Sequence, residues 1–249
     1  MEYSQFCEEC TRIFRQNALP NPTQEQLEKL HFLTEYLLKV NQSMNLTAIR
    51  DEKQVILKHY ADSLTLLPYL PEGAKMLDVG CGAGFPTLPI AIFCPDLQIT
   101  ALDSTAKRIE FVKSVATQLN LSHVFPVAAR AEDVAHDPQS REHFDVVTAR
   151  AVAALPVLAE LCLPLCRIGG TFLAMKAKQA PEEILAARNA IGLCGGGICT
   201  AHTISLISDD NNPAETPNSD CRTLLEIKKI SQTPKIYPRH FSKIAKKPL

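Results

Sequence analysis

The segment Lys75–Thr105 reads KMLDVGCGAGFPTLPIAIFCPDLQITALDST and contains the pattern that decides the fold. An apolar run ends at Val79, three glycines follow within five residues, and a second apolar run begins soon after them. A glycine-rich turn between a strand and a helix lets the backbone approach a ligand closely. Such a turn can hold a dinucleotide, a phosphate group or S-adenosylmethionine, and these ligands imply different proteins.

The spacing of the glycines favours S-adenosylmethionine. A dinucleotide fingerprint reads GxGxxG, and its third glycine allows close helix packing while the pyrophosphate lies at the helix N-terminus. Here the order is GxGxG, with Gly80, Gly82 and Gly84 followed by Phe85. Asp78 lies two residues before the first glycine, where its charge would repel a pyrophosphate but would suit a sulfonium and an ammonium. We therefore expect Asp78 and the three glycines at a cofactor site.

Acidic residues also follow the next two strand-like runs. Asp103 lies about twenty residues beyond the glycines, where a carboxylate can accept both ribose hydroxyls of NAD or of S-adenosylmethionine. The third run leads into ARAEDV at 129–134, in which Glu132 or Asp133 could accept the adenine amino group. An exposed acidic helix start explains that pair equally well.

The pattern of the sequence changes near residue 70, from helical segments to alternating strands and helices. Before it, apolar residues recur at helical spacing, and Thr23 with Gln26 and Asp51 with Gln54 form capping patterns. After it, strand-like and helix-length segments alternate, which indicates a mostly parallel sheet covered on both faces. The last two runs lack a helix between them, so a hairpin should leave the final strand antiparallel, at or near an edge. The expected strands are Ala74–Val79, Gln98–Leu102, Val124–Ala128, Phe144–Thr148, Thr171–Lys176, Thr200–Ile207 and Arg222–Ile230.

Composition and cysteine usage narrow the class of protein. The chain has 249 residues and is 46% hydrophobic, which is enough for one large core. It shows neither a long apolar run nor a basic start before an apolar segment, so we expect a soluble, cytoplasmic protein without a membrane partner. The nine cysteines are scattered, and Cys7 and Cys10 form a lone CxxC without the second pair of a zinc site. We expect no metal.

Charge is distributed unevenly although the net charge is only -1. Residues 227–249 contain seven Lys or Arg and no acid, which is a candidate contact for a polyanion. The segment SDDNNPAETPNSD at 208–220 is acidic and rich in Pro and Asn, which is typical of a solvated loop. The basic residues that we expect to contact a polyanion are Lys235, Arg239, Lys243, Lys246 and Lys247.

Several motifs together resemble the bacterial small-subunit ribosomal RNA methyltransferase G family, also called glucose-inhibited division protein B. They span nearly the whole chain, which makes the resemblance far more specific than the glycine loop alone. The family usually has glycine where Thr87 stands, and often where Ala177 stands. The matching motifs are NLTAIRD (45–51), KHYADS (58–63), DVGCGAGFPTLPIAI (78–92), LDSTAKR (102–108), ARAEDV (129–134), TARAVA (148–153), LAMKA (173–177) and TPKIYPR (233–239).

This resemblance implies a class I, Rossmann-like methyltransferase that methylates guanine N7 in 16S ribosomal RNA. The implied architecture is a helical extension at 1–70, then an S-adenosylmethionine-dependent domain at 71–249 that includes a basic tail from about 231. The implied partner is small-subunit RNA or an assembling ribosomal particle, so RNA is the polyanion that the five basic residues of the tail would bind, and we expect a monomer. The family's cofactor positions fall on Gly80, Phe85, Ala131, Glu132 and Arg150.

The fourth strand tests the chemistry separately from the resemblance. Its end, VVTARAVA, has neither the Asn or Asp followed by prolines typical of amine methylation nor the cysteine nucleophile of C5-pyrimidine methylation. Guanine N7 already has a free lone pair, so its methylation needs positioning rather than a general base. Arg150 is the positioning candidate, since its planar fork could hold guanine O6, a phosphate or the cofactor carboxylate. The alternative is a structural ion pair with Asp145 or Glu132.

Other matched polar residues are less specific. Asn45 and Thr47 could contact cofactor or RNA, or could form a turn and cap. His59 on a predicted helix is more readily explained as packed or solvated than as catalytic. Lys176 ends the fifth strand, where it could reach an RNA phosphate or simply meet solvent. Three other functions stay open: a small-molecule methyltransferase, a non-catalytic RNA-binding module and a nicotinamide oxidoreductase.

Overall fold

The computed structural model describes residues 1–176, 180–207 and 221–249. Ala177 and the segment expected to be a solvated loop at 208–220 lie outside the described residues. Seven strands form one sheet in the order β3-β2-β1-β4-β5-β7-β6, which confirms the predicted α/β fold. The strands are β1 (Lys75–Val79), β2 (Gln98–Asp103), β3 (Val124–Ala128), β4 (Phe144–Arg150), β5 (Cys166–Lys176), β6 (Gly196–Ser205) and β7 (Cys221–Lys229).

The sheet is parallel from β3 to β5 and antiparallel at its other end. Strand β7 pairs antiparallel with both β5 and β6, so it lies between them and β6 forms the edge. The expected antiparallel final strand is therefore found, one place in from the edge. Two strands also begin earlier than expected, β5 at Cys166 and β6 at Gly196.

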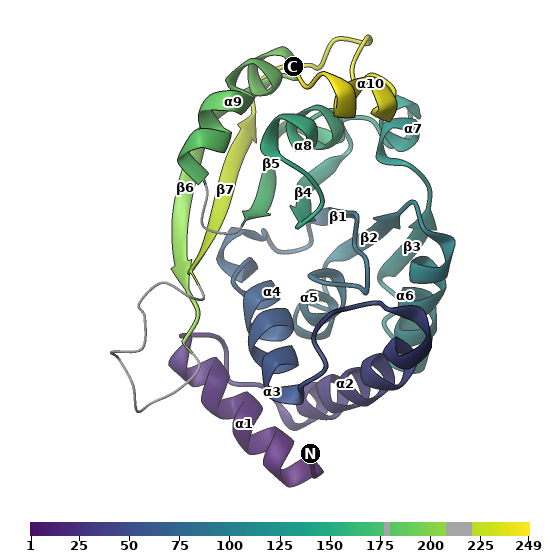
Figure 1. Ribbon diagram of the computed structural model, residues 1–249, viewed down its shortest axis with the longest axis vertical. Coiled ribbons are helices and arrows are strands. Elements are labelled where there is room, and N and C mark those ends of the chain that lie inside the picture. The colour runs from purple at the N-terminus through teal and green to yellow at the C-terminus, as the bar shows by residue number, and fades with distance from the viewer. Residues whose placement is uncertain (177–179, 208–220) are drawn as a thin grey trace.

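Helices cover both faces of the sheet, because successive strand side chains point to opposite faces. Met76 belongs to a core shared with the N-terminal helices, whereas its neighbour Leu77 belongs to the core on the opposite face. In Figure 1, α7 to α10 gather in the upper part of the molecule, and α1 to α6 gather in the lower part. The helices are α1 (Tyr3–Gln16), α2 (Gln24–Met44), α3 (Glu52–Val55), α4 (Asp62–Leu64), α5 (Thr87–Phe93), α6 (Ala106–Gln118), α7 (Ala131–His136), α8 (Leu155–Cys162), α9 (Ala180–Leu193) and α10 (Phe241–Lys246).

The N-terminal helices begin where the capping patterns predicted. Thr23 and Gln26 form a reciprocal capping box at α2, and the Asp51 side chain accepts the Gln54 backbone N–H at α3. A π-helical turn, η1 (Ile56–Ala61), joins α3 to α4. Such a turn often accompanies a functional site.

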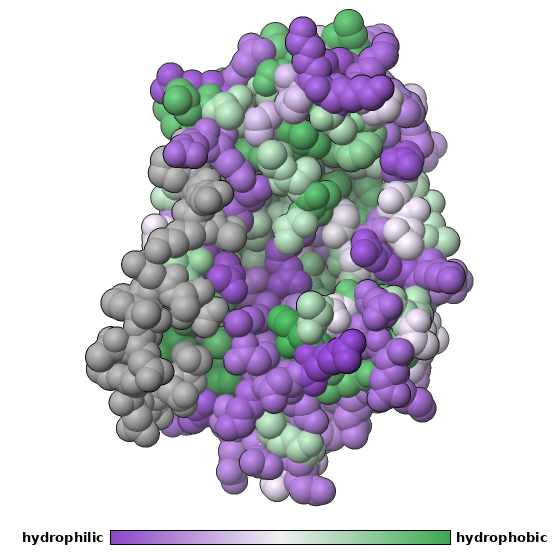
Figure 2. Space-filling model, in the orientation of Figure 1, coloured by the Kyte–Doolittle hydropathy of each residue, from purple (hydrophilic) through white to green (hydrophobic). Residues whose placement is uncertain are grey.

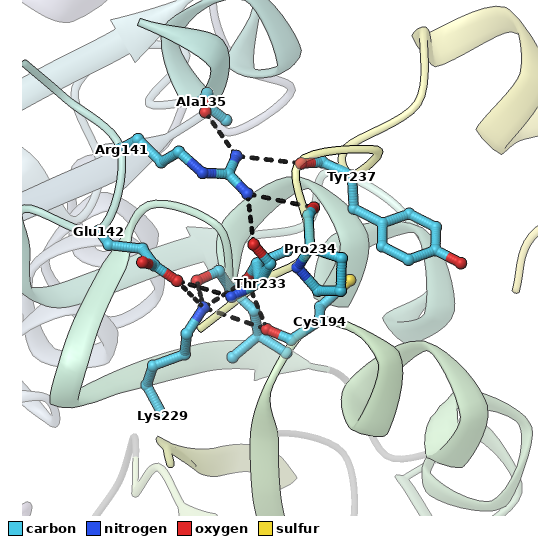
Figure 3. Close-up of polar contacts among 9 residues, drawn as sticks. Ala135, Arg141, Glu142, Cys194, Lys229, Thr233, Pro234 and Tyr237 are labelled. Atoms are coloured by element: carbon cyan, nitrogen blue, oxygen red, sulfur yellow. Dashed lines mark hydrogen bonds and ion pairs between the residues drawn. The ribbon is translucent and has the colours of Figure 1, made fainter. Parts of the chain in front are cut away.

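The C-terminal segment is held against the body of the protein (Figure 3). The Arg141 guanidinium donates to the backbone oxygens of Thr233, Pro234 and Tyr237 at 2.8 to 3.2 Å. Lys229 is 1% exposed, and its Nζ lies 3.1 Å from a carboxylate oxygen of Glu142. These contacts give residues 231–249 a fixed course rather than that of a free tail. In the part of the chain that the structure describes, no helix is both long and apolar enough to cross a membrane.

Candidate active site

A cavity of about 610 Å³ opens where β1, β2, β4 and β5 end. The helices after β1 and β2 pack in one core, while α8 after β4 packs in the other, so the connections change face between β1 and β4. Ligands of open α/β sheets bind at such a point, outside the carboxyl ends of the strands. The N-terminal segment supplies the facing wall through Thr47, Ile49, Lys58, His59 and Asp62. Figure 2, which has the orientation of Figure 1, shows hydrophilic surface at the middle of the molecule, near the ends of β4 and β5.

The glycine loop has two distinct roles. Gly80 and Gly82 border the cavity and have φ angles of 76° and 56°, a region that disfavours other residues. Gly84 has φ 83°, and a Cβ there would lie 2.5 Å from Leu88 Cδ1, so its role is close helix packing. Of the three predicted glycines, the structure therefore places two beside the cavity and one behind it.

Asp103 lies at the end of β2 and borders the cavity, as the ribose prediction requires. Its Oδ2 accepts the Gly82 N–H at 3.1 Å, and its Oδ1 accepts the Thr105 N–H at 2.8 Å. Arg108 Nη1 lies 3.4 Å from Oδ2. Each carboxylate oxygen has further lone pairs, so the group is oriented by its neighbours and can still accept from a diol.

Asp78 is fully buried behind the loop, set back from the described residues that border the cavity. Its Oδ2 accepts the Thr87 hydroxyl at 2.7 Å, so the family-atypical threonine has a defined partner. Asp78 Oδ1 has no hydrogen-bond partner among the described residues. Burial raises the pKa of Asp78 to about 6, although Thr87 and Arg150 act in the opposite direction.

Arg150, at the end of β4, is held by the N-terminal wall of the cavity. Its Nη1 donates to Asp62 Oδ2 at 2.9 Å and to the Lys58 carbonyl at 3.1 Å, and its Nη2 lies 3.3 Å from His59 Nδ1. The guanidinium carbon lies 5.5 Å from the centre of the Phe85 ring. The ion pair considered with Asp145 or Glu132 is therefore wrong, because the partner is Asp62. In these contacts Nε and one Nη2 hydrogen stay available to a ligand.

His59 and Phe85 form a stacked pair inside the cavity wall. Their ring centres lie 4.2 Å apart, with an interplanar angle of 9°. Burial, followed by the nearby charge of Arg150, lowers the pKa of His59 to about 3. His59 is thus a neutral, packed ring, in line with the simpler explanation of the sequence, and Phe85 reaches the cavity as predicted.

Glu132 and Ala131, at the start of α7, are not among the described residues that border the cavity. Glu132 is 4% exposed, and its Oε1 accepts the backbone N–H of Phe241 at 3.2 Å. Its carboxylate is therefore directed to the C-terminal segment, so we no longer expect that carboxylate to hold adenine. Asp133, the other candidate, is exposed.

Lys176 and Asn45, two of the residues predicted to bind RNA, differ in their position relative to the cavity. Lys176 borders it, but Nζ donates to the Ala153 carbonyl and pairs with Glu183, both at 2.8 Å. Asn45 is the left-handed C-cap of α2, and it is Thr47 rather than Asn45 that reaches the cavity. For Asn45 the geometry matches the turn-and-cap alternative.

The predicted basic tail lies apart from the cavity, on and around α10. Lys235, Lys243, Lys246 and Lys247 are exposed. Arg239 differs, because Nη2 and Nε donate to the two carboxylate oxygens of buried Glu160 at 2.7 and 2.8 Å. Arg239 is thus a structural residue, and we remove it from the RNA-binding candidates.

Sequence reasoning missed several residues that border the cavity. Asp62, Arg108 and Arg222 come from three separate elements and converge only in the folded chain. The motif KHYADS at 58–63 contains Asp62, but no local pattern in it indicates a role for that aspartate.

The cavity fits S-adenosylmethionine better than a dinucleotide. Gly80 contributes only backbone atoms to the cavity wall, and there is no room for a side chain, because a Cβ at this position would lie 2.6 Å from Val152 Cγ2. Asp78 lies behind the loop, where its carboxylate opposes a pyrophosphate, whereas Asp103 can accept the ribose hydroxyls of either ligand. The same two carboxylates suit a ligand that carries ribose hydroxyls and positive charge.

Comparison with known proteins agrees with this geometry. The family model described as rRNA small subunit methyltransferase G matches residues 26–205. A protein of that name from Lactobacillus delbrueckii subsp. bulgaricus is 45% identical, over 95% of this chain and 96% of its own length. Another from Desulfitobacterium hafniense is 40% identical, over 96% of this chain and 95% of its own length.

Solved structures share the fold at low sequence identity. An S-adenosylmethionine-dependent methyltransferase from Aquifex aeolicus aligns with a TM-score of 0.52 at 14% identity, covering 74% of this chain and 96% of that one. A 16S rRNA (adenine(1408)-N(1))-methyltransferase from Catenulisporales acidiphilia aligns with a TM-score of 0.50 at 11% identity, covering 64% and 89%. These matches support the fold class.

Proposed function

The chain belongs to the rRNA small subunit methyltransferase G family and is an S-adenosylmethionine-dependent methyltransferase, and on that basis we propose that it methylates N7 of a guanine in 16S ribosomal RNA. One observation supports this most directly. Cofactor-type groups, Gly80, Gly82 and Asp103, border the same cavity as Arg150 and Lys176. Cofactor and base can therefore meet in one enclosed space.

The cofactor side of the cavity is preorganised. Gly82 and Thr105 fix the Asp103 carboxylate, which would accept the ribose hydroxyls, and Gly80 and Gly82 would let the cofactor approach the backbone. S-adenosylmethionine, when bound, supplies an electrophilic methyl group. Phe85 borders the same space and provides an apolar surface.

The target base would lie on the side of the cavity formed by the N-terminal segment and Arg150. Among the described residues that border this side, none is suited to removing a proton from the base. His59 is neutral but buried against Phe85, with one ring nitrogen toward Arg150 and the other toward Thr47. Asp62 is engaged with Arg150. Attack by guanine N7 requires no deprotonation, so a site built on positioning is sufficient. The open donors of Arg150 would hold guanine O6.

RNA binding would combine cations at the cavity with exposed lysines farther away. Lys58, Arg108, Lys176 and Arg222 border the cavity, where positive side chains would attract the RNA backbone. The exposed lysines of the C-terminal segment would add contacts to phosphate. The partner is then small-subunit RNA, free or within a ribosomal particle, and we propose that the enzyme acts as a monomer.

The test is transfer of tritiated methyl groups into small-subunit RNA from cells that lack the protein, offered both free and as particles. We expect one labelled guanine, which base-specific cleavage at 7-methylguanine would locate. Label on another atom would disprove the N7 assignment. Label confined to small molecules, or none in RNA, would favour the small-molecule or non-catalytic alternatives.

A further inference from the structure

Three acceptors of the N-terminal segment determine how Arg150 lies. The Lys58 carbonyl and Asp62 bind one terminal nitrogen of the guanidinium, and His59 Nδ1 faces the other at 3.3 Å. Two contacts at Nη1 anchor one end of the planar guanidinium, and a contact at Nη2 holds its other end, so the three acceptors together restrict both its plane and its position. His59 supplies that contact.

The other nitrogen of the same ring is also occupied. His59 Nε2 lies 3.0 Å from Thr47 Oγ1, which itself accepts the Ile49 backbone N–H at 3.1 Å. Arg150 can only donate, so Nδ1 must be the acceptor and Nε2 must carry the hydrogen. The tautomer of His59 is therefore set by Arg150, and the Thr47 hydroxyl oxygen can accept the hydrogen on Nε2.

The surroundings of His59 keep the ring neutral. It is 7% exposed, it stacks on Phe85, and the charged group that faces it from β4 is Arg150. On its own helical segment the nearest acid is Asp62, whose oxygens lie toward Arg150 and Arg222. A proton on Nδ1 would place an N–H against the N–H of a cation, which would break the contact.

We propose that His59 is a positioning residue for methyl transfer, which as a neutral Nε2–H imidazole orients the guanidinium of Arg150 toward the target base. The expected effect of His59 on the rate rests on the proposed function, whereas the geometry of its contacts does not. Thr47 supports this form of the ring by accepting the hydrogen on Nε2. The N-terminal helices thereby take part in the reaction rather than only in folding.

Two matched substitutions test the proposal. Asparagine places an acceptor at the position of Nδ1, whereas glutamine places its amide near Nε2, so His59→Asn should keep the contact to Arg150 and His59→Gln should lose it. With unmodified small-subunit particles as substrate, we expect kcat within about threefold of wild type for His59→Asn and about tenfold or more below it for His59→Gln. The dissociation constant of S-adenosylhomocysteine, measured by calorimetry, should be unchanged in both.

The proposal is overturned if His59→Gln retains full kcat, or if both folded variants lose kcat equally. Nitrogen-15 NMR of the wild-type imidazoles tests the geometry without any reaction. We expect one histidine in the Nε2–H form that stays neutral at pH 5, where a free imidazole is protonated. In Thr47→Val that tautomer preference should weaken. Titration of every histidine near pH 6.5 would overturn the geometry, while inactive wild-type enzyme with the expected spectrum would refute only the proposed function.

Discussion

Arg239 and Glu160 form a two-pronged ion pair, in which the arginine comes from the C-terminal segment and the glutamate is entirely buried in α8. Removing the arginine side chain would leave the buried carboxylate with the Arg239 backbone N–H at 2.9 Å but without the cation that balances its charge. We expect Arg239→Ala to lower the free energy of unfolding by about 3–5 kcal/mol. Urea denaturation would measure it, with exposed Lys243→Ala as a control that changes stability by less than about 0.5 kcal/mol. Equal stability of both variants would contradict a structural role for Arg239.

The exposed lysines make a separate prediction about RNA. Replacing Lys235, Lys243, Lys246 and Lys247 by glutamine should weaken RNA binding and reduce the slope of log K against log salt by up to about 0.7 for each lost contact to single-stranded RNA. Substitution is preferable to deleting residues 231–249, because deletion would also remove the partners of Arg141, Glu160 and Glu132. A salt slope equal to that of the wild type would show that these lysines only face solvent.

Asp103 provides the test of cofactor identity. Asp103→Ala should weaken S-adenosylhomocysteine binding by roughly 1–3 kcal/mol, through lost hydrogen bonds to the ribose. Glu110 is exposed and is not among the described residues that border the cavity, so Glu110→Ala serves as the control and should bind normally. Calorimetry of the wild type should detect no NADH binding. An NADH signal without an S-adenosylmethionine signal would instead support the oxidoreductase alternative.

Asp78 predicts a pH dependence of stability. Its folded pKa of about 6 lies above the ordinary value of 3.8, so the folded state favours the protonated form. Its stabilising contribution is then complete below pH 3.8 and is lost as the pH rises through about 6. Relative to Asp78→Asn, the wild type should lose about 2 kcal/mol between pH 4 and pH 7. A constant difference between the two proteins in denaturant unfolding would contradict the raised pKa.

Arg150 makes the kinetic prediction. Arg150→Lys keeps the charge, but a single ammonium cannot reach Asp62, the Lys58 carbonyl and His59 in one plane while also presenting donors to guanine. Single-turnover transfer at saturating cofactor and RNA should slow about tenfold or more. The wild-type rate should be nearly level between about pH 6.5 and 9, since no base needs to ionise. A steep rise of rate with pH would show that the chemistry is wrongly assigned.

Local patterns in the sequence were enough to predict the sheet and much of the cofactor side. Asp103 and the glycines are close in sequence to the strands that place them, so their positions follow from strand and loop alone. The partners of Arg150 and Glu132 lie 88 and 109 residues away, in segments whose docking no local pattern encodes. Arg239 has the same charge as the neighbouring lysines, so the sequence predicts the same role for all of them. Its pairing with Glu160, 79 residues away, follows only from the fold.

The position of β7 between β5 and β6 has a consequence for the order of synthesis. When β6 leaves the ribosome, its only neighbour in the completed sheet has not yet been translated, because β7 follows it in the chain. The ten residues of β6 can therefore enter the sheet only after β7 has been translated, because β7 pairs with both β6 and β5. Until then β5 is the outermost strand of the sheet, and its edge is open to pairing with other chains.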